Sequence, residues 1–424
     1  MQAQSVEAKQ PGKLGLTAKI LIGMALGMAF GLAVNYLKLP EEVNTFIVSG
    51  ILQTGGSIFI NIMKMLVVPV VFISLVGGVA NIGNPSQLGR IGIRTLLLYL
   101  ITTCVAISLA VSIAYLFGIG HGSHLTPPTQ VNIAKPTSLS ETIINMIPTN
   151  PFKSFAEANM LQIIVFSILI GFAITMVGKA GKRIKLFFSD FEAIIMQLVI
   201  MMVKVTPIGV FCLIGNLFAK QGLGFIGHLV EYFLTVLGVL LLHLCLINSL
   251  LLTVLAKLNP IRFFKKMFPA MLFAFSTSSS NVSIPIVMET AEDKLGVDRA
   301  IASFVIPLGA TINMDGTAIM QGVATVFIAN IYHIDIGITG YLSVIVTATL
   351  ASIGTAGVPG VGLITLAMVL RQVGLPIEGI ALIIGADRLL DMVRTAVNIT
   401  GDAMISCVVA RREKKFNLEI FQAD

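Results

Sequence analysis

The stretch GADRLLDMVRTAVNITGD, residues 385–402, decides how the rest of the chain is interpreted. On a helix, at about 100° per residue, its polar side chains share one stripe about 100° wide. The stripe contains Asp387, Asp391, Arg394, Thr395, Asn398 and Asp402. Within a bilayer it must face a cavity, a partner or an ion, because an unpaired charge at mid-membrane costs at least about 2.5 kcal/mol. We therefore take this stripe as the candidate functional site.

The composition is that of an all-α integral membrane protein. The 424 residues are 56% hydrophobic and 12% charged, with no Trp, and the mean hydropathy is +0.93. Six apolar runs are long enough for a hydrocarbon core about 30 Å thick. These runs are 15–37, 44–80, 95–119, 142–178, 187–218 and 225–256. A soluble core could not bury so many long apolar segments, so we expect a multi-pass protein of the cell membrane.

The net charge of +7 follows the membrane topology, and nucleic acid is not needed to explain it. Basic residues gather between alternate apolar runs, as at 90–94, 179–185, 257–266 and 411–415. Positively charged loops remain on the cytoplasmic side of a membrane. The pattern therefore predicts an even number of crossings, with both termini in the cytoplasm.

Beyond residue 258 the apolar segments are interrupted by small polar runs. The runs are STSSSNVS (276–283) and ASIGTAGVPGVG (351–362), and each lies between two short apolar arms. Arms of about ten residues are too short to cross, so each pair predicts a re-entrant helical hairpin. A helix with a polar motif follows each hairpin, and the two units start from opposite sides. Inverted repeats with broken helices indicate a secondary transporter.

The charges of the stripe suit a zwitterion with an additional carboxylate. Arg394 offers a planar fork of donors for a carboxylate, and Asp391, one turn earlier, can accept from an ammonium group. The alternative is that Asp391 and Arg394 simply pair with each other, which would leave Asn398 and Asp402 unexplained.

Hard oxygen ligands close to the stripe indicate Na⁺ rather than a soft metal. Asn313 and Asp315 in NMDGT and Asn398 and Asp402 in NITGD supply them. The neighbouring glycines, Gly309, Gly316 and Gly401, permit local unwinding that would free backbone carbonyls. Taken alone, NMDGT could equally be a capped helix kink. The two hairpin tips place N–H groups where an anion could bind.

Four motifs in this order resemble the dicarboxylate/amino acid:cation symporter family, which contains the glutamate transporters. They are the SSSN run, NMDGT, SIGTAGVPG and LDMVRTAVNITGD, and the resemblance extends from KMLVVPVVF (64–72) to Ala410. It implies eight transmembrane helices, two re-entrant hairpins, a homotrimer and an elevator-type movement of a transport domain against a scaffold. The implied division is scaffold helices 1 and 2 (1–85), transport helix 3 (86–120), scaffold helices 4 and 5 (121–220), transport helix 6 (221–257), the transport core of both hairpins and helices 7 and 8 (258–412), and a cytoplasmic tail (413–424).

The resemblance also implies roles for individual residues. Arg394 would hold the side-chain carboxylate of the substrate and Asp391 its amino group. Other substrate contacts would come from Ser280, Asn281, Thr317, Gly357, Thr395 and Asn398. One Na⁺ site would use Gly309, Asn313, Asn398 and Asp402. A second would use Thr311, Ser352, Ile353 and Thr355, and a third Tyr99, Thr102, Thr103, Asn313 and Asp315.

The chain differs from other members of the family at several positions that bear on function. Asn281 stands where a third serine is usual, and Arg388 is an additional cation close to the stripe, while Ser278 stands where some members have an Arg. Arg388 could supply that positive potential, or it could simply pair with Asp387 or another acid. Gln321 replaces the Glu of carriers that counter-transport K⁺ and co-transport a proton. Asp402 is a carboxylate that proton-coupled bacterial members tend to lack.

These observations predict a Na⁺-coupled symporter for glutamate or aspartate and not an enzyme. A proton-coupled carrier and a C4-dicarboxylate carrier are the alternatives, although a dicarboxylate has no ammonium group for Asp391 to bind. A serine hydrolase is disfavoured, because the 276–280 run has no G-x-S-x-G turn and no nearby base. An anion channel is also disfavoured, because a two-site inverted repeat suits the alternating access of a transporter better than it suits a channel.

Overall fold

The computed structural model of the chain describes residues 16–37, 39–81, 89–122, 144, 147–157, 159–353, 357 and 359–423. Within these ranges every regular element is a helix, and one isolated β-bridge joins Val297 to Phe416. The all-α prediction is therefore confirmed. Two compact units make up the chain, one of residues 1–62 and 201–225 and the other of residues 63–200 and 226–424.

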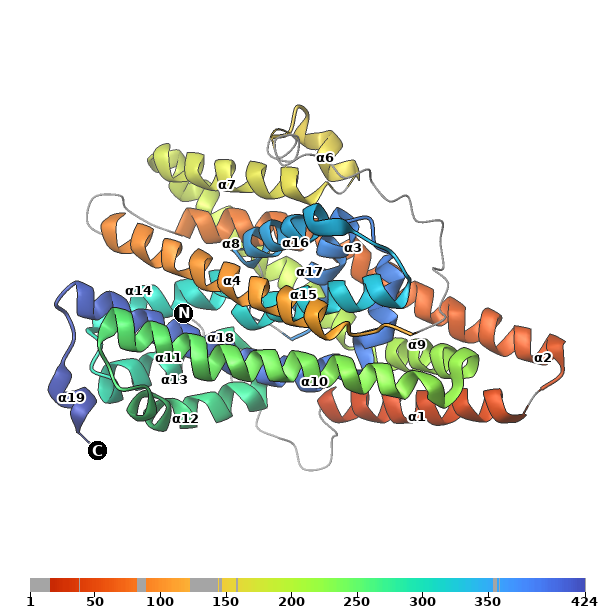
Figure 1. Cartoon of the computed structure of the whole chain (residues 1–424). Coiled ribbons are helices and arrows are strands. Elements are labelled where there is room, and N and C mark those ends of the chain that lie inside the picture. The colour runs from red at the N-terminus through yellow and green to blue at the C-terminus, as the bar shows by residue number, and fades with distance from the viewer. Residues whose placement is uncertain are drawn as a thin grey trace, which may run out of the picture. The chain divides into compact units, whose positions relative to one another are not determined.

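The first unit is built on α1 (Leu16–Leu37) and α9 (Thr206–Gln221), which lie side by side (Figure 1). Glycines spaced four residues apart along α1 allow the two backbones to approach. A Cβ at Gly23 or Gly27 would lie 2.5 or 2.6 Å from a backbone oxygen of α9. Small residues at this spacing commonly bring membrane helices together. The unit also contains α2 (Glu41–Thr45), η1 (Phe46–Leu52), the start of α3 (Gln53–Asn81) and η2 (Gly222–Phe225).

The second unit is organised around α18 (Ile380–Arg412), which packs against α10, α12, α13, α14 and α15. Most of α18 is buried, and so is every residue of α15 from Asp315 to Ala329. The remaining elements of the unit are the rest of α3, α4 (Gly89–Phe117), α6 (Pro151–Glu157), α7 (Met160–Met176), α8 (Lys179–Val203, whose end belongs to the first unit), α10 (Ile226–Leu242), η3 (His243–Ile247), α11 (Asn248–Leu251), η4 (Leu252–Ala256), α12 (Pro260–Thr277), α13 (Ser280–Glu289), η5 (Thr290–Lys294), α14 (Arg299–Ile312), α15 (Asp315–Ile331), α16 (Gly337–Ser352), α17 (Val361–Gln372), η6 (Ile377–Gly379) and α19 (Leu418–Gln422).

Several helices are long and apolar enough to cross a membrane. Among the described residues there are four, at Ala18–Leu37, Glu41–Ile62, Ile91–Phe117 and Gly222–Ala256. A fifth span is present if the pair Lys179–Met202 and Thr206–Lys220, bent by 49°, is counted as one. The chain is thus a multi-pass membrane protein, as its composition predicts. The finer prediction of eight crossings stays a prediction.

The first predicted hairpin is present as α12 and α13, which pack against each other. The break between them is shorter than the polar run suggested, because only Ser278 and Ser279 lie outside the helices. Ser278 adopts a left-handed conformation with φ of 51°. The Ser279 side chain then accepts a hydrogen bond from the backbone N–H of Val282. This cap lets the following polar residues, Ser280 to Ser283, join α13.

The second predicted hairpin is present as α16 and α17, which also pack against each other. Its tip, residues 353–360, is partly described, since residues 354–356 and 358 lie outside the described ranges. The arms are longer than the purely apolar segments, because α16 has 16 residues and α17 has 12. The re-entrant depth of both hairpins in a membrane stays a prediction.

The chain is unwound at NMDGT but not at NITGD. α14 ends at Ile312 and α15 begins at Asp315, which leaves Asn313 and Met314 with non-helical backbone angles. The expected unwinding at the three glycines is wrong, because Gly309 lies within α14, Gly316 within α15 and Gly401 within α18. Gly401 serves close packing instead. A Cβ there would lie 2.9 Å from the side-chain nitrogen of Asn313.

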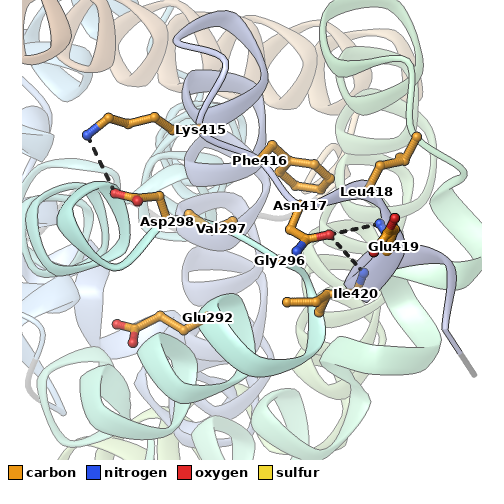
Figure 2. Close-up of a pocket in the computed structure, with 10 residues that line it drawn as sticks. All are labelled: Glu292, Gly296, Val297, Asp298, Lys415, Phe416, Asn417, Leu418, Glu419 and Ile420. Carbon is orange, nitrogen blue, oxygen red and sulfur yellow. Dashed lines mark hydrogen bonds and ion pairs between the residues drawn. The ribbon is translucent and has the colours of Figure 1, made fainter.

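The C-terminal residues 413–422 pack along the ends of several helices of the second unit. Glu413 pairs with Arg94 of α4, and Lys415 lies 3.7 Å from Asp298. The backbone N–H of Asn417 donates to the oxygen of Gly296 at 2.7 Å. Figure 2 shows the open pocket of about 670 Å³ that this segment borders. The predicted tail is therefore an ordered segment that ends in α19.

Candidate functional site

The polar stripe lies on the buried helix α18, as the sequence predicts. Asp387, Asp391, Arg394, Asn398 and Asp402 are all buried, and the Arg394 side chain is only 1% exposed. The helix can place them together because positions three and four residues apart share one face. Charged groups at this depth need partners. Their partners divide the stripe into two ends, which we name for their candidate ligands: the anion-binding end around Arg394 and the ion-binding end around Asp402.

The anion-binding end is centred on the guanidinium of Arg394. Its Nη2 lies 2.7 Å from Asp391 and 3.0 Å from Asp387. The simple pairing of Asp391 with Arg394 is therefore present, and Asp387 adds a second carboxylate. Arg388 lies 3.4 Å from Asp391, so the additional cation also pairs with an acid of the stripe.

The same guanidinium keeps a free face. Nε and Nη1 of Arg394 are buried and have no hydrogen-bond partner among the described residues. Gly362 of α17 borders this face, and a Cβ there would lie 3.0 Å from Nη1. Buried donors without a partner are costly. A carboxylate oxygen at Nη1 would form a charge-assisted hydrogen bond there.

The two hairpin tips meet at Gly357. The hydroxyl of Ser279 donates to the Gly357 oxygen at 2.7 Å, and the backbone N–H of Asn281 donates to the same oxygen at 3.2 Å. Ser280 lies beside them, because a Cβ on Gly357 would come within 2.9 Å of the Ser280 Cβ. Of the other predicted substrate contacts, Thr395 donates to the Asp391 carbonyl at 2.8 Å, and Thr317 is buried at the start of α15.

The ion-binding end joins α18 to the break between α14 and α15. Asn313 donates to Asp402 Oδ1 at 2.9 Å, while Asp402 Oδ2 is buried without a partner among the described residues. Asn398 Oδ1 accepts the backbone N–H of Gly316 at 2.8 Å. Gly309 must lack a side chain, because a Cβ there would collide with Asp402. The structure thus brings together Gly309, Asn313 and Asp402 of the first predicted ion site, while Asn398 contacts Gly316 and Met314 beside them.

The residues predicted for the third ion site also come together, from α4 and the break. Thr103 donates to Asp315 Oδ1 at 2.6 Å, and Thr102 donates to Asn313 Oδ1 at 3.3 Å. Tyr99 is buried, and its hydroxyl donates to the Val305 carbonyl at 2.9 Å. In the described chain, no group of three or more His, Cys, Asp or Glu side chains is placed to hold a metal. Hydroxyl, amide and single carboxylate oxygens are a donor set that suits a hard cation of low charge.

The second predicted ion site is not assembled by direct contacts. The hydroxyls of Thr311 and Ser352 donate to carbonyls of their own helices, at 2.9 and 2.8 Å. Ile353 is the C-cap of α16. Thr355 lies outside the described residues. Among the described residues, no hydrogen bond joins the side chain of Thr311 to that of Ser352.

The contacts of three residues of the site were not predicted by the sequence analysis. Asp387 was placed in the stripe, but its ion pair with Arg394 was not predicted. Gly362 could be recognised only as part of a Gly-rich tip. His243 is buried and contacts Asp315, although the two residues are 72 positions apart. A single histidine in an apolar run carries no periodic signal that could have identified it.

This combination of membrane-length helices, a broken helix and a buried stripe of charges and oxygen ligands is that of a membrane transporter. Comparison with known proteins agrees. A profile of the Sodium:dicarboxylate symporter family matches residues 16–412. The chain therefore belongs to this family, as its motifs predict, and it is a transporter and not an enzyme.

Individual relatives match over nearly the whole chain. It is 36% identical over 417 residues to the Proton/sodium-glutamate symport protein of Bacillus subtilis (strain 168), which covers 96% of this chain and 94% of that protein. It is 35% identical over 425 residues to the Proton/glutamate-aspartate symporter of Escherichia coli (strain K12), with coverage of 96% and 94%. The Neutral amino acid transporter B(0) of Bos taurus is 32% identical over 420 residues, with coverage of 91% and 77%.

Proposed function

We propose that the protein couples inward movement of Na⁺ to uptake of glutamate or aspartate. The observation that carries the proposal is the free face of Arg394, where Nε and Nη1 are buried and unpaired. A carboxylate of the substrate would give these unpaired donors an acceptor. The relatives named as glutamate or glutamate-aspartate symporters support this choice of substrate.

The amino group of the substrate finds its partner on the same helix. Asp391 lies one turn before Arg394 and accepts from both Arg394 and Arg388. An incoming ammonium can take over part of this role, while Asp387 continues to balance the charge of Arg394. A C4-dicarboxylate has no ammonium to offer Asp391, so the amino acid is the better fit.

The ion-binding end supplies the coupling site. Asp402 Oδ2 is a buried carboxylate oxygen without a partner among the described residues, and such an oxygen must hold a cation or a proton. Asn313 faces Asp402 with its amide nitrogen. The neutral oxygens nearby are Oδ1 of Asn313, Oδ1 of Asn398 and the unwound backbone at Met314. A cage of one negative charge and several neutral oxygens suits a monovalent cation.

Transport would follow the elevator scheme implied by the family motifs. In this proposal the protein is a homotrimer of the cell membrane with both termini in the cytoplasm. Residues 86–120 and 221–412 form the mobile transport part, with its inverted repeats, and residues 1–85 and 121–220 form the scaffold. The tip around Gly357 closes over the substrate, because Ser279 and Asn281 can hold it by hydrogen bonds to a single carbonyl.

Uptake into liposomes that contain the purified protein tests this function. We expect aspartate or glutamate to accumulate with an inward Na⁺ gradient and not with a proton gradient in Na⁺-free buffer. The Escherichia coli relative is named for protons alone, which makes proton coupling the second candidate. Accumulation driven by a proton gradient alone would contradict Na⁺ coupling. Faster uptake of succinate than of either amino acid would contradict the assigned substrate.

A further inference from the structure

His243 is a buried polar residue to which the proposed transport cycle gives no role. It begins η3, a π-helical segment within the long membrane-length run Gly222–Ala256. Its side chain is 0% exposed, and its Nε2 lies 3.1 Å from Oδ2 of Asp315. The preceding helix, α10, packs against both α15 and α18.

The contact completes the hydrogen bonding of a buried carboxylate. Thr103 donates to Oδ1 of Asp315 at 2.6 Å, and His243 approaches Oδ2. An ionised carboxylate only accepts hydrogen bonds, so Nε2 of His243 is the donor. Each carboxylate oxygen offers about two lone-pair directions, so one on each oxygen remains available. The two donors therefore fix the rotation of the carboxylate and leave a defined set of directions open.

The oxygen that His243 approaches lies near the rest of the ion cluster. A Cβ on Gly401 would lie 2.9 Å from the amide nitrogen of Asn313 and 3.7 Å from Oδ2 of Asp315. Asn313 in turn binds Asp402. Oδ2 of Asp315 and the Asn313–Asp402 pair therefore both lie beside Gly401 of α18.

The helix containing His243 has a π-helical turn at the point of contact. π-Helical turns are rare and occur often at functional sites, because they shift one side chain out of the regular register. The other ring nitrogen of His243, Nδ1, is buried without a partner among the described residues. An apolar side chain would avoid the cost of an unpaired buried polar atom. The energetic reason for a histidine here must therefore lie in its Nε2 contact.

We propose that His243 is a positioning residue of the Na⁺ site and sets its affinity by holding Asp315. This inference rests on the proposed Na⁺ coupling. Groups that hold a metal ligand in place typically change metal affinity by about 10–100-fold when they are replaced. Loss of the Nε2–H donor should therefore raise the Na⁺ concentration for half-maximal effect by about tenfold, while the substrate contacts at Arg394 remain.

Two variants with the same chemistry but different reach test the proposal. The amide nitrogen of His243→Gln can occupy the position of Nε2, whereas that of His243→Asn is one methylene too short. Cys245→Ala, on the same π-helical segment and exposed, is the matched control. The purified proteins are titrated with NaCl at constant ionic strength, and both the melting temperature and aspartate uptake in liposomes are recorded.

We expect His243→Asn to shift both Na⁺ titrations about tenfold, and His243→Gln to restore most of the affinity. The aspartate KM at saturating Na⁺ should remain within about twofold of the wild-type value in both. Combined with Asp315→Asn, the His243→Asn change should have no additional effect, because its partner is already altered. Equal Na⁺ titrations for all variants, or equal shifts in the Asn and Gln variants, would overturn the role of His243 alone. A wild-type protein without any Na⁺ response would overturn the proposed function as well.

Discussion

The guanidinium of Arg394 is balanced by carboxylates on one side only. Asp387 and Asp391 both contact Nη2, while Nε and Nη1 have no partner among the described residues. A charge buried in this way is stable as long as the pair on Nη2 persists. Under the proposed function, the unpaired nitrogens favour a ligand that brings acceptor oxygens, such as a carboxylate.

Two replacements of Arg394 test the role of its charge and the role of its planar shape separately. Arg394→Cys should reduce aspartate and glutamate uptake by at least about 100-fold, because losing one partner of a buried charge pair costs about 2–5 kcal/mol. Arg394→Lys keeps the charge but not the fork, so it should retain part of the uptake. Initial rates for labelled aspartate and for labelled serine measure both effects. Undiminished aspartate uptake by the Cys variant would show that another group binds the carboxylate.

Gly362 limits the space beside the same guanidinium. A Cβ there would lie 3.0 Å from Nη1 and 3.3 Å from Cζ of Arg394, so the side chain would have to move by a few tenths of an ångström. A misplacement of a functional group by about 1 Å can lower the rate of a reaction about 100-fold. We therefore expect Gly362→Ala to raise the aspartate KM by about tenfold. Gly238→Ala in α10 is the matched control, because a Cβ there meets nothing within 4 Å. An unchanged KM in Gly362→Ala would contradict this assignment.

At the scale of elements, the two hairpin tips are joined through one carbonyl. Ser279 and the backbone of Asn281 both donate to the oxygen of Gly357. Gly357 itself is a poor position for a probe, since a Cβ there would lie 2.9 Å from the Ala310 oxygen. Pro359 is on the same tip and half-buried, which makes it the better place for a reporter.

A Cys at Pro359 reports opening of the second tip. In a background without the native cysteines, we expect aspartate with Na⁺ to slow labelling of Pro359→Cys, because the ligand closes the tip. Ser279→Ala should speed labelling of the ligand-free protein about fivefold, since one hydrogen bond contributes about 1 kcal/mol. The reaction rate with a water-soluble maleimide measures both. Identical rates with and without ligand would show that this tip is not a gate.

The elements differ in how well the sequence predicts them. The stripe of α18 and the break at Asn313 were predictable, because helical spacing and a polar motif in an apolar run are local signals. The length of the first break was not, because the cap formed by Ser279 makes Ser280 to Ser283 helical. The contact of His243 with Asp315 and the packing of residues 413–422 depend on partners far away in the chain. No periodicity in one sequence identifies such partners.

At the scale of the molecule, α18 connects the proposed substrate site to the proposed ion site. Arg394 and Asp391 occupy one stretch of it, and Asp402 lies two turns further on, bonded to Asn313. Asn398 lies between them and accepts from the backbone of Gly316, at the start of α15. Under the proposed function, an ion that orders the break between α14 and α15 would act through Asn398 on the same helix that binds the substrate.

Asp402 is the residue at which this coupling is most directly tested. Its Oδ2 has no partner among the described residues, so it needs a cation when it is ionised. Asp402→Asn removes the charge but keeps the size and an oxygen that can still accept from Asn313. We expect this variant to lose most of its Na⁺ dependence, with a Na⁺ half-saturation raised by at least about tenfold, because carboxylate charge sets the attraction for a hard cation. The matched control is Asp335→Asn. Asp335 is an exposed acid that accepts a hydrogen bond from the backbone N–H of Gly337.

The measurement is aspartate uptake into liposomes as a function of external Na⁺, with the internal and external pH kept equal. The wild-type and Asp335→Asn proteins should show the same steep Na⁺ dependence. Gln321 donates to Thr365 at 2.8 Å and has no proton to release, so neither protein should require a proton or K⁺ gradient. A Na⁺ dependence that survives in Asp402→Asn would place the coupling ion elsewhere. Strong uptake by the wild type from a proton gradient alone, in Na⁺-free buffer, would instead mean that Asp402 Oδ2 takes a proton in each cycle.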